Sequence, residues 1–376
     1  MRHYAPETPI SAQDRPLDLT IVIPTLNEAE NVLKLFERLN LTLAGRAWEA
    51  IFVDDGSTDG TAETLTDLAQ RDRRVRLIRR FGRRGLSSAV MEGMLASTSP
   101  LLAVIDADLQ HDETILPQML DAILSGNHDL AVGTRYASGG SIGAWASHRA
   151  RISRLATRLA TWVIKTPLSD PMSGFFAIRR DVLLQAAPRV SGIGYKVLLD
   201  LVASSGRSLR VAEIPYCFRN RSRGESKLDS LVALEYFEML LDKSIGRWIP
   251  AKFILFGMVG ALGLLVHLAV LALATGPIDL GFRSGQTLAV ITAMTFNFFL
   301  NNRLTYRDRR LVGLGFLRGL LSFYLICSLG AVANIGIGTI LFARHESWWV
   351  AGVAGAVVGS VWNYVIGGMF TWKKRP

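Results

Sequence analysis

The chain has 376 residues, of which 49% are hydrophobic and 20% are charged, and its mean hydropathy is +0.26. Soluble chains of this length usually carry more charge, so the composition argues against a wholly soluble protein. The first 250 residues hold 31 basic against 29 acidic residues, and the last 126 hold 11 against 3. Because these last basic residues flank long apolar runs, they indicate a membrane and exclude a nucleic-acid partner.

The N-terminus and the cysteines exclude a secreted, disulfide-stabilised protein. Residues 1–17 are polar, with no apolar stretch behind a basic start, so we predict a flexible N-terminus without a cleavable secretory signal. The two cysteines, Cys217 and Cys327, provide neither a disulfide framework nor a cysteine-based zinc site. We therefore expect the first 250 residues to stay in the cytoplasm.

Short apolar runs alternate with helical patterns through the first half of the chain. The runs are predicted strands at 19–24, 50–53, 75–78 and 101–105, and the helical patterns cover 31–43, 61–71 and 86–97. Continuous apolar strands separated by helices are typical of a parallel sheet that is covered on both faces. The predicted fold class is therefore α/β, with a mostly parallel, Rossmann-like sheet.

Polar clusters follow three of these strands, at residues 24–28, 54–57 and 106–110. In parallel sheets, ligands bind at the carboxyl ends of the strands. Strand alternation would point Asp106 and Asp108 the same way, with Gln110 two residues further on, which suits a hard divalent cation such as Mg²⁺ or Mn²⁺. The alternative is a turn at the strand end in which an aspartate only caps the backbone.

The other two clusters allow both a ligand role and a helix-capping role. A carboxylate at Asp55 can hold a base edge or ribose hydroxyls, while Ser57, Thr58 or Asp59 caps the next helix. Glu28 would be a first-turn carboxylate that the helix dipole favours.

Two amphipathic segments precede the apolar C-terminal part. Residues 142–165 interleave four arginines with tryptophan, leucine and isoleucine, as in a helix that lies among lipid headgroups. The alternative is a solvated face over the domain core. Residues 231–249 are also amphipathic, and we predict that residues 228–250 form an interfacial connector to the membrane.

Residues 251–376 contain four apolar spans, at about 253–275, 284–302, 319–343 and 348–372. Five arginines lie between the second and third spans, whereas the other two links hold one each, so both termini and the middle loop are predicted to be cytoplasmic. Residues 297–307 align with 363–373, which predicts two related helix hairpins.

Six ordered motifs resemble those of GT-A glycosyltransferases of family 2, and specifically polyprenyl-phosphate sugar transferases of the dolichol-phosphate mannose synthase type. They occupy residues 23–28, 53–57, 106–110, 133–136, 170–175 and 221–227. The resemblance spans about residues 18–245, within which we predict a catalytic domain at 18–227. The last 126 residues resemble the GtrA-type membrane module that some of these enzymes carry.

The resemblance implies inverting, metal-dependent transfer of a sugar from a nucleotide-diphosphate sugar to a polyprenyl phosphate (dolichyl or undecaprenyl) at the cytoplasmic membrane face. The residues implied for the nucleotide sugar are Pro24, Glu28, Val53, Asp55, Asp106, Ala107, Asp108, Gln110, Arg221 and Lys227. Those implied for the metal are Asp106, Asp108 and Gln110. Those implied for the acceptor phosphate are Arg135 and Arg149. Asp108, Arg135 and Arg149 are the implied catalytic residues. Leu26 departs from the family, where an aromatic residue is frequent, and this weakens any transfer of base specificity.

Three alternatives remain open at this point. The donor is predicted to be GDP-mannose, but a UDP-sugar such as UDP-glucose suits the same motifs. A processive polysaccharide synthase typically has Gln-x-x-Arg-Trp near the membrane, and here Ser244 takes the place of the glutamine before Arg247 and Trp248. A lipid-carrier translocase or scaffold with an idle transferase domain is the alternative from another class. The oligomeric state, including a homo-oligomer, is also left open.

Overall fold

The computed structural model of the chain describes residues 17–82, 84–137, 160–161, 163–192, 194–219, 230–246, 248–344 and 348–373. The chain forms two compact units, Met1–Ser244 and Ile245–Pro376, which are treated separately below. The predicted flexible N-terminus and most of the predicted basic helix at 142–165 lie outside the described residues.

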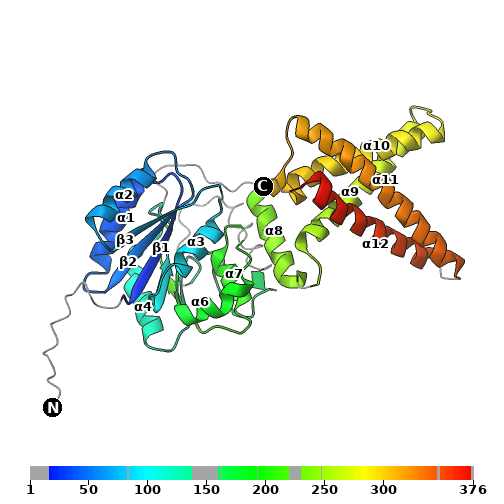
Figure 1. The fold of residues 1–376 in the computed structure, drawn as a ribbon. Coiled ribbons are helices and arrows are strands. Elements are labelled where there is room, and N and C mark those ends of the chain that lie inside the picture. Colours follow the sequence, from blue (N-terminus) through cyan, green and yellow to red (C-terminus); the bar gives the residue numbers. More distant parts are fainter. Residues whose placement is uncertain are drawn as a thin grey trace, which may run out of the picture. The chain divides into compact units, whose positions relative to one another are not determined.

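The first unit is built on a mixed, mostly parallel sheet of seven strands in the order β3-β2-β1-β4-β6-β5-β7 (Figure 1). The strands are β1 (Leu19–Thr25), β2 (Trp48–Asp54), β3 (Val75–Arg79), β4 (Leu101–Val104), β5 (Leu130–Thr134), β6 (Phe176–Arg179) and β7 (Val211–Pro215). Only β6 among them runs antiparallel, to both β4 and β5. The predicted fold class is confirmed.

Helices cover both faces of the sheet, with α1 and α2 on one side and α3, α6 and α7 on the other (Figure 1). They are α1 (Ala29–Thr42), α2 (Thr61–Arg71), α3 (Leu86–Leu95), α4 (Leu116–Leu124), α6 (Arg180–Ala186), α7 (Val197–Ser204) and α8 (Ser230–Ile245), with short 3₁₀ turns at η1 (Glu113–Ile115) and η2 (Ala187–Arg189). The predicted elements lie within about two residues of those in the structure.

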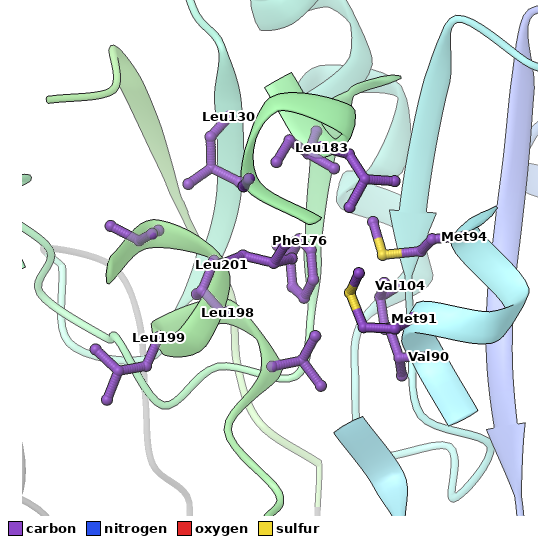
Figure 2. Close-up of a cluster of buried hydrophobic side chains, with 14 of the residues drawn as sticks. Val90, Met91, Met94, Val104, Leu130, Phe176, Leu183, Leu198, Leu199 and Leu201 are labelled. Atoms are coloured by element: carbon purple, nitrogen blue, oxygen red, sulfur yellow. The ribbon is translucent and has the colours of Figure 1, made fainter. Parts of the chain in front are cut away.

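Strand alternation divides the interior into two apolar clusters. In β1, Val22 belongs to the cluster on the α3 side, whereas Ile21 and Ile23 belong to the cluster on the α1 side. Figure 2 shows the first cluster, in which Phe176 of β6 lies between the methionines of α3 and the leucines of α7. Gly93 lets α3 approach the sheet, because a Cβ there would lie 2.5 Å from Val22 Cγ1.

Helix α8, in the predicted connector at 228–250, contributes side chains to the core of the first unit. Its residues Met239 and Leu240 are buried in the same cluster as the leucines of α7, and Glu238 is buried beside them. This apolar face is therefore occupied inside the first unit.

The second unit consists of α9 (Ala251–Thr275), α10 (Phe282–Leu300), α11 (Leu314–Ala343) and α12 (Trp348–Ile366), with a 3₁₀ turn at η4 (Arg307–Arg309). Within the described residues, two stretches are long and apolar enough to cross a membrane, Ala251–Thr275 and Leu314–Ala333. Helices α9 and α10 pack as one hairpin, and α11 and α12 pack as another.

The predicted internal repeat is visible in the ends of these hairpins. Helix α10 continues into a π-helical turn at η3 (Asn301–Thr305), and α12 does the same at η5 (Gly367–Thr371), which are aligned positions in the repeat. Tyr306 and Trp372, the next aligned pair, stack on each other with ring centroids 4.2 Å apart. Asn302 accepts a hydrogen bond from Trp372 Nε1 (3.1 Å), so this buried amide joins the two repeats.

Candidate active site

The sheet brings the predicted polar clusters to one edge. Strands β1, β2 and β4 are parallel neighbours, so the residues after Thr25, Asp54 and Val104 meet there. Strand β5 ends at the same edge, because it is antiparallel to β6, which is antiparallel to β4. Arg135 follows β5 directly, and residues 170–175 lead into β6 from this edge.

Residues 106–110 form a tight turn and not a continued strand, so the alternation argument for this motif was wrong. Leu109 has a φ of +61°, which is uncommon for a side chain of this kind and marks a constrained turn. Asp108 Oδ1 accepts a hydrogen bond from the backbone N–H of Gln110 (3.2 Å). The Gln110 amide nitrogen donates to the carbonyl oxygen of Arg219 (3.1 Å), which orients this side chain.

Both carboxylates of this turn nevertheless influence one buried phenol, that of Tyr216 just after β7. Burial raises the pKa of Tyr216 above its ordinary value; Arg135 lowers it, and the carboxylates of Asp170, Asp106 and Asp108 raise it further. The Tyr216 hydroxyl is buried and has no hydrogen-bond partner within the described part of the chain. A polar group of this kind, buried among carboxylates, fits a site that holds a polar ligand.

Two neighbours lie against Asp106. His111 Nδ1 accepts a hydrogen bond from the Asp106 backbone N–H (3.3 Å), and His111 Nε2 lies 3.8 Å from Asp106 Oδ2. Burial lowers the pKa of His111 to about 4; Arg135 lowers it as well, and Asp108 raises it. The ring is therefore neutral at pH 7. On the other side, a Cβ at Gly174 would lie 2.8 Å from Asp106 Oδ2, so only glycine leaves room for this carboxylate.

The donor set of this turn fits a hard divalent cation but does not complete its shell. Asp106 and Asp108 provide carboxylate oxygens and Gln110 an amide oxygen, which are the ligand types that Mg²⁺ and Mn²⁺ take. Within the described residues, no group of three or more His, Cys, Asp or Glu side chains could hold a metal ion. The remaining ligands of such a cation would have to come from a bound molecule or from water.

Arg135, which the resemblance assigns to the acceptor phosphate, is held by a carboxylate that the sequence analysis did not select. Its Nε donates to Asp170 Oδ2 (2.7 Å) and its Nη2 donates to Asp170 Oδ1 (2.9 Å). Burial opposes the charge of Arg135, but these hydrogen bonds raise the pKa of the guanidinium overall. The guanidinium also lies over the ring of Phe218 (5.3 Å). Arg135 is thus rigidly oriented.

Lys196 is a second cation that the sequence analysis missed. It lies at the N-terminus of α7, and its pKa is lowered by burial and by Arg135, while Asp170 and Asp106 raise it. The loop that precedes Lys196 lies against the start of α3, because the backbone N–H of Ser87 donates to the carbonyl oxygen of Gly194 (3.2 Å). The sequence signal that could have indicated Lys196 is the segment Gly-Ile-Gly-Tyr-Lys. In the structure, its glycines at 192 and 194 have positive φ.

Asp55 is more tightly engaged than its predicted nucleoside-binding role suggests. Its carboxylate forms a buried ion pair with Arg80 and accepts a hydrogen bond from the backbone N–H of Gly85 (2.8 Å). A ribose or base contact would have to share these oxygens. Pro24 is buried in β1, and the side chains of Val53 and Ala107 are packed in the two cores, so these two residues present only backbone to a ligand.

The first two loops at this edge are joined by hydrogen bonds. The Glu28 backbone N–H donates to Thr61 Oγ1 (2.8 Å), and the Thr58 backbone N–H donates to Asn27 Oδ1 (2.9 Å). Asp59 Oδ1 accepts from the backbone N–H of Thr61 (3.1 Å) at the start of α2, whose N-cap position is Gly60 and not one of the three predicted capping residues. The Glu28 carboxylate accepts from Asn31 Nδ2 (2.6 Å) at the start of α1. These loops therefore form one rigid wall.

Arg149, Arg221 and Lys227, the other predicted cations, lie outside the described residues. The chain just before the last two is anchored to the acidic turn, because the Arg219 backbone N–H donates to the carbonyl oxygen of Gln110 (2.9 Å). The Arg219 guanidinium also pairs with Glu113 (2.7 Å). Arg219, the last described residue before Arg221, therefore lies at the acidic turn.

The chain matches the family Glycosyl transferase family 2 over residues 20–185 and the GtrA/DPMS transmembrane domain over residues 255–372. It is 34% identical over 363 residues to a dolichol-phosphate mannosyltransferase of Pyrococcus furiosus, with 95% of this chain and 99% of that one covered. Proteins of the same name are 37% identical in Mycosarcoma maydis (68% and 85% covered) and 35% identical in Saccharomyces cerevisiae (64% and 92% covered).

A solved structure of glucosyl-3-phosphoglycerate synthase from Mycobacterium tuberculosis is also similar, at 20% identity, with 64% of this chain and 85% of that chain covered and a TM-score of 0.46. That likeness is too loose to support conclusions about the site. The near-complete match to the first relative carries the assignment, and it agrees with the resemblance that the motifs indicated. The chain belongs to glycosyl transferase family 2 and is a glycosyltransferase that carries a GtrA-type transmembrane domain.

Proposed function

We propose that this glycosyltransferase moves mannose from GDP-mannose to a polyprenyl phosphate, with inversion, at the cytoplasmic face of a membrane. The observation that carries the proposal is the match, over 95% of the chain, to a relative named dolichol-phosphate mannosyltransferase. The site supports it with an acidic turn suited to a metal–diphosphate and two nearby cations, Arg135 and Lys196, suited to phosphates.

The donor diphosphate is proposed to bind at the acidic turn. A Mg²⁺ or Mn²⁺ ion held by Asp106, Asp108 and Gln110 would supply Lewis-acid stabilisation of the departing diphosphate. Gly174 and His111 keep the Asp106 carboxylate in place for this purpose. Lys196 then faces the diphosphate as a point charge. Glu28, Asp55 and the backbone at Pro24, Val53 and Ala107 are proposed to contact the nucleoside, and Arg221 and Lys227 to close over the phosphates.

The acceptor phosphate is proposed to bind Arg135 and Arg149. A guanidinium that Asp170 holds in one orientation would orient the attacking phosphate oxygen. The phosphate is already ionised at pH 7, so the attack needs no general base. This fits the neutral His111, which supports a carboxylate and need not remove a proton. Catalysis then comes from alignment and from charges set in place beforehand.

The remaining proposals concern organisation in the membrane. We propose a catalytic domain at 18–227, a connector at 228–250 and a membrane domain at 251–376 with four spans, both termini being cytoplasmic. The uneven arginine content of the links supports this topology. Accessibility of single cysteines placed in the links, tested from each side of the membrane, checks it.

The test uses membranes that contain the full chain, polyprenyl phosphate and Mg²⁺ or Mn²⁺, with radiolabelled GDP-mannose and UDP-glucose offered separately. The expected result is an acid-labile β-linked mannolipid from GDP-mannose alone, lost in Asp108→Asn and retained in the matched surface variant Asp121→Asn. Lipid label from UDP-glucose alone would reassign the donor. No label from a wider donor panel would favour the translocase or scaffold. A trapped glycosyl–carboxylate intermediate would exclude single inversion.

A further inference from the structure

Asp200 is a buried carboxylate outside the proposed ligand set that gathers an unusual number of donors. It lies in the first turn of α7 and its side chain is fully buried. Its oxygens accept hydrogen bonds from the backbone N–H of Ser191 (3.2 Å), the hydroxyl of Ser191 (2.6 Å) and the backbone N–H of Gly192 (3.1 Å). A further bond comes from the hydroxyl of Ser204 (3.3 Å), in the last turn of the same helix.

The counter-ion of Asp200 comes from a different helix, α8. Lys243 Nζ lies 2.7 Å from Asp200 Oδ1 and is itself 10% exposed. The same ammonium donates to the carbonyl oxygen of Arg189 (2.7 Å) and to Ser204 Oγ (2.9 Å). A lysine has three donors, and all three are used here. Buried pairs of this kind are often no better for stability than apolar residues of the same size, so the pair calls for a role in geometry.

The geometry that the pair fixes is that of the segment from Ser191 to Lys196. Gly192 and Gly194 have φ values of +64° and +77°, so the backbone there takes a path that few residues allow. Asp200 binds the start of this segment through its side chain and the end through its backbone N–H, which donates to the carbonyl oxygen of Lys196 (3.1 Å). In the middle, the carbonyl oxygen of Gly194 accepts from the backbone N–H of Ser87 (3.2 Å).

We propose that Asp200 and Lys243 are positioning residues for the proposed reaction, which couple the placement of α8 to the placement of the Lys196 ammonium in the donor site. The inference rests on the proposed function in one respect, the role of Lys196 toward the donor diphosphate. Helix α8 ends at Ile245, and the apolar helix α9 starts at Ala251, so the helix that leads toward the membrane domain holds an active-site loop in place.

The test compares Lys243→Met with Lys243→Arg in the full-length protein, with the surface change Lys34→Met as the matched control. Lys243→Met should lower kcat/KM for the donor on the order of 10-fold and leave the KM of the acceptor unchanged. Lys243→Arg should restore most of the loss. In a Lys196→Ala background, Lys243→Met should add little, because both changes remove the same contribution.

A second readout does not depend on any sugar transfer. The rate at which an amine-specific acylating reagent labels Lys196, read by peptide mass spectrometry, should change several-fold (about 3-fold or more) in Lys243→Met and return in Lys243→Arg. If Lys243→Met leaves an unfolded protein, the double variant Asp200→Asn with Lys243→Gln removes both charges and carries the same expectations.

The outcomes separate the two proposals. If the wild-type protein transfers no sugar, yet Lys243→Met changes the rate of Lys196 labelling, the proposed function is refuted and the coupling is kept. The coupling is refuted if folded Lys243→Met leaves both the labelling of Lys196 and the donor kinetics unchanged. It is also refuted if the loss of kcat/KM in Lys243→Met adds fully to the loss in Lys196→Ala. A lower unfolding temperature with normal kcat and KM would show that the pair only stabilises the fold.

Discussion

The substitution Gly174→Ala should disturb the acidic turn, the proposed metal site, without replacing any predicted ligand. The new Cβ would lie 2.8 Å from Asp106 Oδ2, whereas ordinary contacts begin at 3.4 Å, so the carboxylate must move by about 0.6 Å. Misplacing a reacting group by about 1 Å can cost 100-fold in rate, so this shift should cost on the order of 10-fold. The loss should take the form of a higher metal concentration for half-maximal activity.

The assay measures initial rates of lipid glycosylation over a series of Mn²⁺ or Mg²⁺ concentrations, together with thermal unfolding. The matched control is Gly281→Ala, because the same added methyl group there meets nothing within 4 Å. Gly174→Ala should unfold within a few degrees of the wild type and regain part of its activity at high metal concentration. Wild-type metal dependence in a folded Gly174→Ala protein would refute the assignment of Asp106 as a ligand.

Two further substitutions test other parts of the structure. Hydrogen bonds from Arg210 and Arg207 hold the pKa of Asp129 below its ordinary value of 3.8, although burial alone would raise it. The ionised Asp129 therefore stabilises the fold above pH 4, and this contribution is lost as the pH falls further. Asp129→Asn should therefore destabilise the first unit by about 1–3 kcal/mol at pH 7 and by much less near pH 2, as read from chemical unfolding at both pH values. Gly263→Ala should lower the unfolding temperature of the second unit, because the Asn297 amide occupies the space of the new methyl group; Gly257→Ala, which meets nothing, should not.

The sequence was sufficient for those parts of the site that follow apolar runs directly. The turn at Asp106 stands after β4 and Arg135 stands after β5, so a strand prediction alone places them at the ligand edge. The direction of the two carboxylates was a different matter. The motif is a turn, and the positive φ of Leu109 turns the chain after Asp108 where alternation would have continued it.

The missed residues lie far along the chain from the acidic turn. Asp170 and Gly174 reach it only because β6 is antiparallel and starts at the ligand edge, and Lys196 reaches it from the N-terminus of α7. His111 could have been predicted from the sequence as a site residue, since it follows Gln110 directly. Its role depends on the backbone of the turn, which lets its Nδ1 accept from Asp106.

Asp55 shows how sheet register changes the reading of a motif. The register of β2 with β3 pairs Asp54 with Arg79, so the next residues, Asp55 and Arg80, are neighbours and form a buried ion pair. Local sequence shows a carboxylate after a strand and predicts a ligand. It does not show the arginine, because parallel strands are joined through a helix and the register is set by packing.

The charges of the site explain why donor and metal should bind together. Asp170 is matched by Arg135, and the carboxylate of Asp106 acts on the charge of Lys196. A diphosphate approaching alone would meet two carboxylates, which repel it at short range. In the proposed mechanism, a divalent cation between them would turn that repulsion into attraction and leave Lys196 for a phosphate oxygen. The position of Lys196 therefore matters most once the cation is bound, and this is the position that the Asp200–Lys243 pair holds.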